Sequence, residues 1–280
     1  MNIAVIAGNI GDQVVRALAH RGSAVRRLKH RRAPAGPLVA GTTEVDFSRP
    51  EEIRRALEGV DSLLSVSPLV PDLVELTSRT LEAARAAGVR HVVRMSARGA
   101  APQAITMGRL HHAAEQAVLS SGMSWTIVRP TTFMQNYLGH AEGIKRQGAF
   151  SSPVGKGRVP YIDVRDIAAV ATEALVDRIH AGRVYEVSGG EALSDPEIAR
   201  ILSEVLRRDV RHIDSTDDDV ARTLRAMGMD DWTIAAVAEL DDITRRGSIG
   251  QPTDGVARVL LRPPITFRQF VSDHRHLFTA

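Results

Sequence analysis

The chain has 280 residues, no cysteine and a formal net charge of +3, from 36 Lys and Arg against 33 Asp and Glu. The absence of cysteine excludes a disulfide scaffold, a zinc-thiolate site, an iron–sulfur cluster and a cysteine nucleophile. No apolar run approaches the roughly 20 residues of a membrane span. The N-terminus also lacks the basic flank of a secretion signal. We therefore expect a cytoplasmic protein that makes no contact with a membrane.

The positive charge is local. Residues 26–32 read Arg-Arg-Leu-Lys-His-Arg-Arg and carry five formal positives and no acid, so the rest of the chain has a net charge of −2. Proteins that bind nucleic acid usually carry a broad basic stripe. The single cluster, together with the lack of a helix-turn-helix pattern, predicts no nucleic-acid partner. A phosphate-sized ligand or a solvated loop explains the cluster more simply.

Strand and helix patterns alternate through the first half. Strands are expected at 3–6, 24–29, 43–47, 60–66, 90–95 and 125–128. Helices are expected from Gly11, from a capping box at Ser48-Arg-Pro-Glu51, and over 71–86 and 106–120, while 30–41 reads as a loop. This alternation predicts βαβ units and therefore an α/β fold, a doubly wound and mostly parallel sheet.

The pattern changes after Gly148. Residues 148–162 look irregular, 163–176 helical and 183–187 extended. A capped helix starts at Ser194, 216–246 reads as helical and acidic, and 266–278 as a last helix. We predict a nucleotide-binding type of domain over 1–150. A smaller, mainly helical lobe over 151–280 would cover the substrate, with some segments returning to the sheet.

Ligands of such sheets bind beyond the carboxyl ends of the strands. The first of these ends carries Gly8-Asn9-Ile10-Gly11, the final G-x-x-G of the dinucleotide fingerprint without its first glycine. Glycines there let a backbone approach a pyrophosphate at a helix N-terminus. A plain strand-to-helix turn with one packing glycine is the alternative interpretation.

Longer motifs carry a family resemblance. They are Val60–Pro68 (VDSLLSVSP), Ala87–Ser96 (AGVRHVVRMS), His112–Glu115 (HAAE), Ser121–Pro130 (SGMSWTIVRP), Phe133–Asn136 (FMQN), Tyr161–Ala168 (YIDVRDIA) and Gly182–Ser188 (GRVYEVS). With the G-x-x-G turn, they resemble the NmrA-like group of atypical short-chain dehydrogenases/reductases almost from end to end.

The resemblance implies a Rossmann-type domain that binds NAD(P). Pyrophosphate would lie at Gly8 to Gly11, adenine near Asp46 and Phe47, and the ribose along Ser65, Val66 and Ser67, with Arg129 and Pro130 also at the cofactor. The family's phosphate-reading arginine falls on His30, which Lys29, Arg31 and Arg32 flank. Arginine matches phosphate geometry. No acid ends the second strand, which favours NADP(H) over NAD(H).

Two departures from the family pattern bear on activity. Family members usually read Thr-Gly-Ala-Thr-Gly before the first helix, whereas this chain reads Ile-Ala-Gly, which is about two residues shorter. The Tyr-x-x-x-Lys pair of catalytic short-chain dehydrogenases is also absent, and the helix at that place reads His111-His112-Ala-Ala-Glu115. Cofactor binding and proton transfer are therefore the two points to test.

Other residues are candidates for the chemistry. Ser96 could position a substrate carbonyl, and His111 or His112 could exchange a proton near neutral pH. Adjacent helical residues point about 100° apart, so only one histidine would face the site. Packing or capping is the alternative role.

The expected substrate pocket comprises Phe133, Met134, Asn136 and Tyr137 with Trp232 as a roof, and core packing is again the alternative. Asp217 to Asp219 diverge around a helix, so no metal site is expected.

Three functions remain open at this point. The first is an NADP(H)-dependent oxidoreductase that reduces a small quinone, ketone or enone, for example in secondary metabolism. The second is a cofactor-independent acid–base enzyme on an aromatic or polyketide-like molecule. The third is a non-catalytic sensor of dinucleotides. A small-molecule substrate and a monomer or homodimer are expected.

Overall fold

The computed structural model describes residues 1–31 and 41–279. Arg32 and most of the predicted loop lie outside the described residues. The chain forms two compact units, Met1–Pro130 with Ile167–Glu186 and Thr131–Asp166 with Val187–Ala280. Compared with the predicted halves 1–150 and 151–280, residues 131–150 belong to the second unit and 167–186 return to the first.

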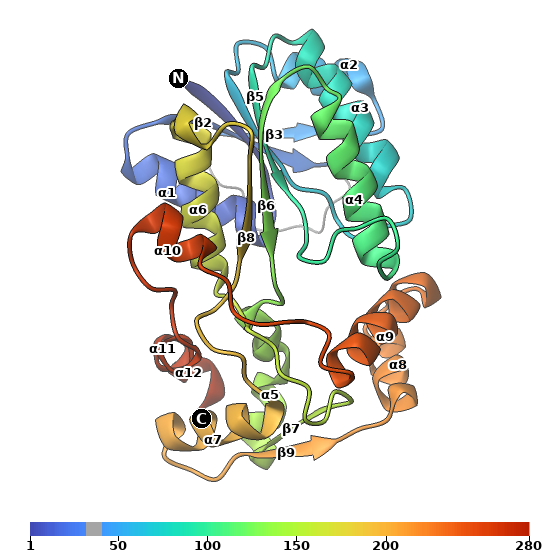
Figure 1. Ribbon diagram of the computed structural model, residues 1–280, viewed down its shortest axis with the longest axis vertical. Coiled ribbons are helices and arrows are strands. Elements are labelled where there is room, and N and C mark those ends of the chain that lie inside the picture. The colour runs from blue at the N-terminus through green and yellow to red at the C-terminus, as the bar shows by residue number, and fades with distance from the viewer. Residues whose placement is uncertain (32–40, 280) are drawn as a thin grey trace. The chain divides into compact units, whose positions relative to one another are not determined.

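A seven-stranded sheet forms the centre of the first unit (Figure 1). Its strands are β1 (Asn2–Ile6), β2 (Ala24–His30), β3 (Thr42–Val45), β4 (Ser62–Ser65), β5 (His91–Met95), β6 (Ser124–Pro130) and β8 (Arg183–Val187). Their order in the sheet is β3-β2-β1-β4-β5-β6-β8. All neighbouring pairs from β3 to β6 are parallel. The predicted doubly wound α/β fold is confirmed.

Helices cover both faces of this sheet. Helices α2 (Pro50–Ala56), α3 (Leu73–Ala86) and α4 (Thr106–Leu119) lie on one face, and α1 (Asn9–His20) and α6 (Val164–Val176) on the other (Figure 1). Leu28, Ile53, Leu63 and Leu81 belong to the core beneath the first group and are essentially inaccessible to solvent. Helices α1 and α6 are joined by Arg21, which donates to Glu173.

The start of α2 differs from the sequence-based prediction. The helix begins at Pro50 with Arg49 at the N-cap and no side-chain cap. Ser48 instead donates to Asp46 Oδ1 through its hydroxyl, at 2.6 Å, and through its backbone N–H, at 2.9 Å. The predicted capping box is therefore wrong. Proline at the first position explains why the helix begins there without a cap, because its missing N–H needs no partner.

The second unit is mainly helical. It contains a 3₁₀ segment η1 (Met134–His140), α5 (Ala141–Gln147), α7 (Asp195–Leu206), α8 (Asp217–Ala226), α9 (Asp231–Arg245), α10 (Gly255–Leu260), α11 (Phe267–Asp273) and α12 (Arg275–Phe278). Strands β7 (Ala149–Ser152) and β9 (Arg211–Asp214) form a parallel pair. Its core includes Tyr137, Phe150, Phe267 and Phe270. In the part of the chain that the structure describes, no helix is long and apolar enough to cross a membrane.

Several boundaries in this unit differ from the predicted ones. β7 lies within the stretch expected to be irregular, and β9 was not predicted. The expected helix over 216–246 is broken after Ala226 because Gly228 has φ +83° and Asp230 caps a new helix by accepting from Thr233 N. The last helix is interrupted at His274. The capping box of Ser194 and Glu197 is confirmed.

Candidate active site

The carboxyl ends of β1 to β6 meet at one edge of the sheet in the first unit. β1 lies between β2 and β4, and the helices that follow β1 and β4 cover opposite faces. Such a switch point opens a crevice in which α/β sheets bind their ligands. The predicted cofactor residues Gly8 to Gly11 follow β1, Asp46 and Phe47 follow β3, and Val66 and Ser67 follow β4.

The turn after β1 is short and leaves open space beside the start of α1. Gly8 has φ +150°, and a Cβ on it would meet nothing within 4 Å. A Cβ on Gly11 would lie 2.1 Å from the carbonyl oxygen of Ile6, so only glycine permits α1 to start so close to β1. The first amides of a helix have no intrahelical partner. The turn therefore presents free α1 amides beside an open space.

The ends of β2 and β3 gather the basic cluster. The His30 ring stacks on Phe47, with centroids 5.7 Å apart. Arg31 Nη2 donates to Glu52 Oε2 at 2.7 Å, so a carboxylate already offsets its charge. The same oxygen accepts from Asp46 N. Lys29 and His30 alternate along β2 and hence point to opposite faces. The cluster is thus less uniformly positive than the sequence indicates.

The end of β4 is tied to β5 by a buried arginine. Arg94 is inaccessible to solvent, and its Nη1 donates to Ser67 Oγ at 2.9 Å and to Ser65 O at 3.4 Å. Burial lowers the pKa of Arg94 to about 10, and Glu115 opposes that shift. The side chain is therefore still a cation at neutral pH. It fixes the segment that the resemblance assigns to the ribose.

Ser96, Glu115 and Arg129 form a hydrogen-bonded network between β5, α4 and β6. Ser96 Oγ donates to Glu115 Oε1 at 2.5 Å. Arg129 donates to both oxygens of Glu115, from Nε at 2.8 Å and from Nη2 at 2.5 Å. The hydrogen bond to Glu115 raises the pKa of Arg129. Ser96 is buried, and its proton is committed to Glu115.

A second acid extends this network. Glu186 on β8 lies 3.7 Å from Arg129 Nη1 and 3.5 Å from Arg98 Nε. The backbone N–H of Arg98 donates to Pro130 O at 2.9 Å. The chain that follows β5 is thereby fixed to the end of β6, where Pro130 is the last residue of the strand.

The two histidines differ. Burial, together with the charge of Arg94, lowers the pKa of His111 to about 3, and its buried Nδ1 has no hydrogen-bond partner. His111 is therefore neutral at pH 7 and is not a general acid there. As whole residues, His111 and His112 are both half-buried. A catalytic role for either histidine stays a prediction.

The predicted substrate-pocket residues all belong to the second unit. Met134 and Tyr137 lie in its core, and Tyr137 packs edge-to-face on Tyr161, Phe150 and Phe267. Phe133 and Trp232 are half-buried, and Asn136 is exposed. Packing therefore occupies two of the five side chains, and the pocket stays a prediction.

Sequence reasoning missed Arg94 and Glu115 as members of the site. Arg94 carried a signal, because a charged residue within the apolar run Val-Val-Arg-Met is rare in a buried strand. Glu115 carried none, since glutamate is common on solvated helix faces. Among the described residues, no group of three or more His, Asp or Glu side chains could hold a metal ion.

Known proteins share both this sequence and this fold. The model of a family described as NAD(P)H-binding matches residues 6–178, more than half of the chain. The chain belongs to this NAD(P)H-binding family. An NAD(P)H azoreductase of Xenophilus azovorans is 38% identical over 277 residues, covering 98% of this chain and 97% of the relative.

A second relative and a solved structure are also similar to this chain. A (4-alkanoyl-5-oxo-2,5-dihydrofuran-3-yl)methyl phosphate reductase of Streptomyces griseus is 36% identical, covering 97% of this chain and 96% of the relative. An NADPH-dependent quinone oxidoreductase of Escherichia coli, solved with NADPH, has a TM-score of 0.85 at 24% identity and covers 98% and 99% of the two chains. That likeness shows the fold. The predictions of a nicotinamide dinucleotide cofactor and of an oxidoreductase are confirmed.

Proposed function

We propose that the chain is an NADPH-dependent reductase of the NmrA-like group of atypical short-chain dehydrogenases/reductases. Its acceptor would be a small conjugated molecule with a polarised double bond, such as a quinone, an enone or an azo compound. The azoreductase and the furanone-type reductase named above support this class of acceptor. A cytoplasmic location and a role in secondary metabolism stay predictions.

The turn at Gly8 and Gly11 is the observation that carries the proposal. It gives a pyrophosphate an open approach to the first amides of α1, where the helix dipole favours an anion. The shortened loop thus keeps the two features that a dinucleotide needs there: a glycine without a side chain above the turn, and a helix that starts close to β1.

The preference for NADPH rests on the basic end of β2. Arg31 would hold a 2′-phosphate, with its guanidinium shared between that phosphate and Glu52. Only one of Lys29 and His30 could join it, because the two side chains point to opposite faces of the sheet. Bound NADPH supplies a hydride to the acceptor. The protein's part is to hold the ends of β4, β5 and β6 fixed, through Arg94 and the network of Ser96, Glu115 and Arg129.

Neither alternative function gains support from the site. An acid–base enzyme built on His111 would need a group that titrates near neutral pH, whereas the pKa of His111 is lowered to about 3. A dinucleotide sensor without turnover would share the whole cofactor site. Turnover with an acceptor therefore separates the sensor from the reductase.

The test is calorimetric titration with NADPH and NADH, followed by oxidation of NADPH in the presence of a quinone, an enone and an azo dye. Gly8→Val would place a side chain in the open turn. We expect it to weaken NADPH binding at least about tenfold, or about 1.4 kcal/mol. Gly22→Ala is the matched control, because Gly22 also has a positive φ and an open Cβ position but lies just past the other end of α1. A folded wild-type protein that binds neither dinucleotide would refute the proposal.

A further inference from the structure

A wide cavity of about 720 Å³, largely open to solvent, lies at the amino-terminal edge of the sheet in the first unit, opposite to the strand ends described above. Asp61 and Arg90 directly precede β4 and β5, Ser124 begins β6, and Arg178 lies in the 3₁₀ segment η2 (Arg178–His180) before β8. Met1 and Ala181 complete its lining. Backbone bonds hold this rim: Asp61 N to Asn2 O at 2.8 Å, and Ser124 N to Arg90 O at 3.0 Å.

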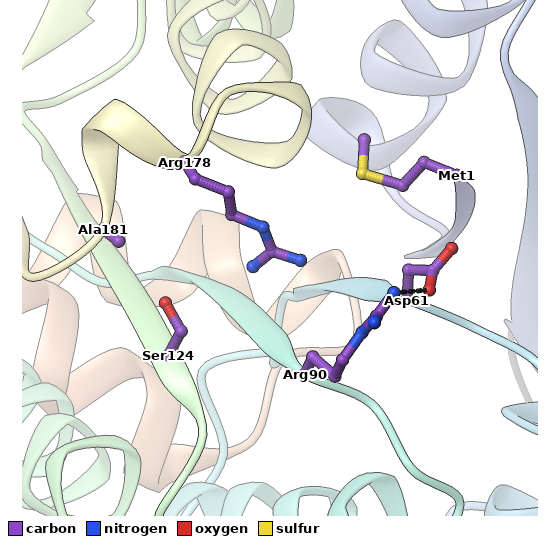
Figure 2. Close-up of a pocket in the computed structure, with 6 residues that line it drawn as sticks. All are labelled: Met1, Asp61, Arg90, Ser124, Arg178 and Ala181. Carbon is purple, nitrogen blue, oxygen red and sulfur yellow. Dashed lines mark hydrogen bonds and ion pairs between the residues drawn. The ribbon is translucent and has the colours of Figure 1, made fainter.

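The cavity carries an excess of positive charge. Among its six lining residues, Asp61 is the one acid, against Arg90 and Arg178. Both oxygens of Asp61 are occupied, Oδ1 by Arg90 Nη2 and Oδ2 by the backbone N–H of Asn2 at 2.8 Å. Figure 2 shows Arg90 turned toward Asp61, while the Arg178 side chain reaches into the middle of the cavity. Arg178 is therefore fully available for a ligand, whereas Arg90 can bind one only through the part of its guanidinium that does not contact Asp61.

Arg178 is exposed to solvent. In the described part of the chain its guanidinium makes one long hydrogen bond, from Nη2 to Ser62 Oγ at 3.5 Å. Burial and the neighbouring charge of Arg90 lower the pKa of Arg178, and Asp61 only partly opposes them. An oxyanion between the two guanidinium groups would relieve this repulsion, and guanidinium forks suit phosphate oxygens.

The hydrogen-bonding role of the Ser124 hydroxyl group determines which kind of oxyanion the cavity can bind. The His91 ring lies behind it, with Nε2 3.1 Å from the carbonyl oxygen of Ala174 and Nδ1 3.1 Å from Ser124 Oγ. A carbonyl only accepts, so Nε2 carries the proton. Burial and Arg178 lower the pKa of His91 to about 4, so the ring is neutral at pH 7. Its Nδ1 atom therefore accepts a hydrogen bond from the Ser124 hydroxyl group. Ser124 can therefore offer only oxygen lone pairs to the cavity.

We propose that this cavity is a binding site for a protonated phosphate group, held by Arg178 and Arg90 and donating its own hydroxyl to Ser124 Oγ. Hydrogen phosphate combines negative oxygens with an O–H donor, whereas sulfate at the same pH has acceptors only and would face the lone pairs of Ser124. The cavity is larger than a phosphate ion, so either free phosphate or the end of a phosphate monoester fits. The site is separate from the proposed cofactor site and does not depend on it.

The experiment is a titration followed by amide NMR shifts at about pH 6, where the second ionisation of phosphate is incomplete and His91 is still neutral. Inorganic phosphate, glycerol 2-phosphate and sulfate are added at constant ionic strength. We expect Ser124 and Ala181 to shift with phosphate, and sulfate to bind more weakly because it has no proton to donate to Ser124 Oγ. Whichever of inorganic phosphate and glycerol 2-phosphate binds more tightly shows whether the site takes a free phosphate ion or a phosphate monoester.

Three variants make the result specific. Arg178→Gln should weaken phosphate binding at least about tenfold, as expected for the loss of a charge-assisted hydrogen bond. Ser124→Ala should reduce the preference for phosphate over sulfate. Arg16→Gln, an exposed arginine in the middle of α1, should change neither and controls for net charge. Equal binding of sulfate and phosphate to the wild type, unchanged binding in Arg178→Gln, or shifts confined to Gly8 and Gly11 would each overturn the proposal.

Discussion

Arg94 and His111 lie close enough to interact electrostatically, and among the described residues each has at least one buried nitrogen atom without a hydrogen-bond partner. These are Nε and Nη2 of Arg94 and Nδ1 of His111. The charge of Arg94 adds to burial in lowering the pKa of His111. A cation held beside a histidine keeps that histidine neutral, and this has a measurable consequence for stability.

The free energy of unfolding should depend on pH through His111. Its pKa is about 3 when folded, against an ordinary value of 6.5, so the unfolded chain binds the proton more tightly. The stabilisation is complete above pH 6.5 and is lost as the pH falls from there toward 3. The limiting slope for one such group is about 1.4 kcal/mol per pH unit. His111→Phe should reduce the slope measured by urea unfolding between about pH 7.5 and about pH 5.5.

His91 adds a second such contribution, because its folded pKa is about 4. Part of the slope should therefore persist in His111→Phe. Replacement of His276, which is exposed in α12, by Gln is the control and should leave the slope unchanged. Identical slopes in the wild type and in His111→Phe would show that His111 is not buried as described.

Glu115 should matter more to stability than any exposed glutamate. Its carboxylate is buried and accepts from Ser96 and twice from Arg129. Glu115→Ala leaves Arg129 without its closest partner and Arg94 without a nearby anion. Removing one partner of a buried ion pair costs about 3–5 kcal/mol, and the partial exposure of Arg129 places the expected loss at the lower end of that range. Urea unfolding should show this loss, whereas Glu58→Ala, which breaks an exposed pair with Arg54, should cost less than about 1 kcal/mol. Equal losses would contradict the assigned network.

The discrimination between NADPH and NADH should respond to Glu52, if the proposed function holds. Glu52 Oε2 accepts from Arg31 and from Asp46 N. Glu52→Gln keeps an acceptor for the backbone but removes the charge that competes for Arg31. We expect the ratio of NADPH to NADH affinity to rise about tenfold or less, since Arg31 is half-exposed. Arg31→Ala should lower the same ratio. Calorimetry with both dinucleotides measures it, and an unchanged ratio in both variants would place the 2′-phosphate elsewhere.

The sequence predicted the sheet well because buried parallel strands read as short apolar runs. All seven strands of the first unit were expected, including β8, and so was the helical face of α1 with Val14 and Leu18 buried. Hydrophobic periodicity predicted the helices and strands of the second unit less completely. β9 has a largely polar sequence, Arg211-His-Ile-Asp214, without alternation of polar and apolar residues, and within the described part of the chain it pairs with β7 alone. Its register depends on tertiary contacts that a local pattern does not contain.

The candidate site was predictable only where backbone geometry demands a residue type. Gly11 is required by the close approach of Ile6 O, and this requirement is visible as a glycine in the fingerprint. The partners of Ser96 and Arg31 were not predictable. Glu115 comes from another element, and Glu52 lies in the first turn of α2 with no pattern that links it to the basic cluster. Ion pairs between distant segments follow from packing, which sequence spacing does not record.

Tyr137 of the second unit was predicted to line the substrate pocket, and a substitution can test whether it belongs to the core instead. Its hydroxyl donates to the buried carboxylate of Asp195, which also accepts from Ser152 Oγ. Burial and Asp195 raise the pKa of Tyr137 well above 10, so the phenol stays protonated. Tyr137→Phe removes one hydrogen bond to a charged acceptor and should lower the free energy of unfolding by about 1.5–3 kcal/mol.

The matched variant is Tyr185→Phe in the first unit, where the lost partner is the Nδ1 atom of His180 at 2.8 Å and no carboxylate is left behind. It should cost about 1 kcal/mol. Because Tyr137 is packed against Tyr161, Phe150 and Phe267, the KM for the acceptor should not change in Tyr137→Phe. A raised KM at unchanged stability would instead place the Tyr137 hydroxyl against the substrate, in line with the substrate pocket that the sequence predicted.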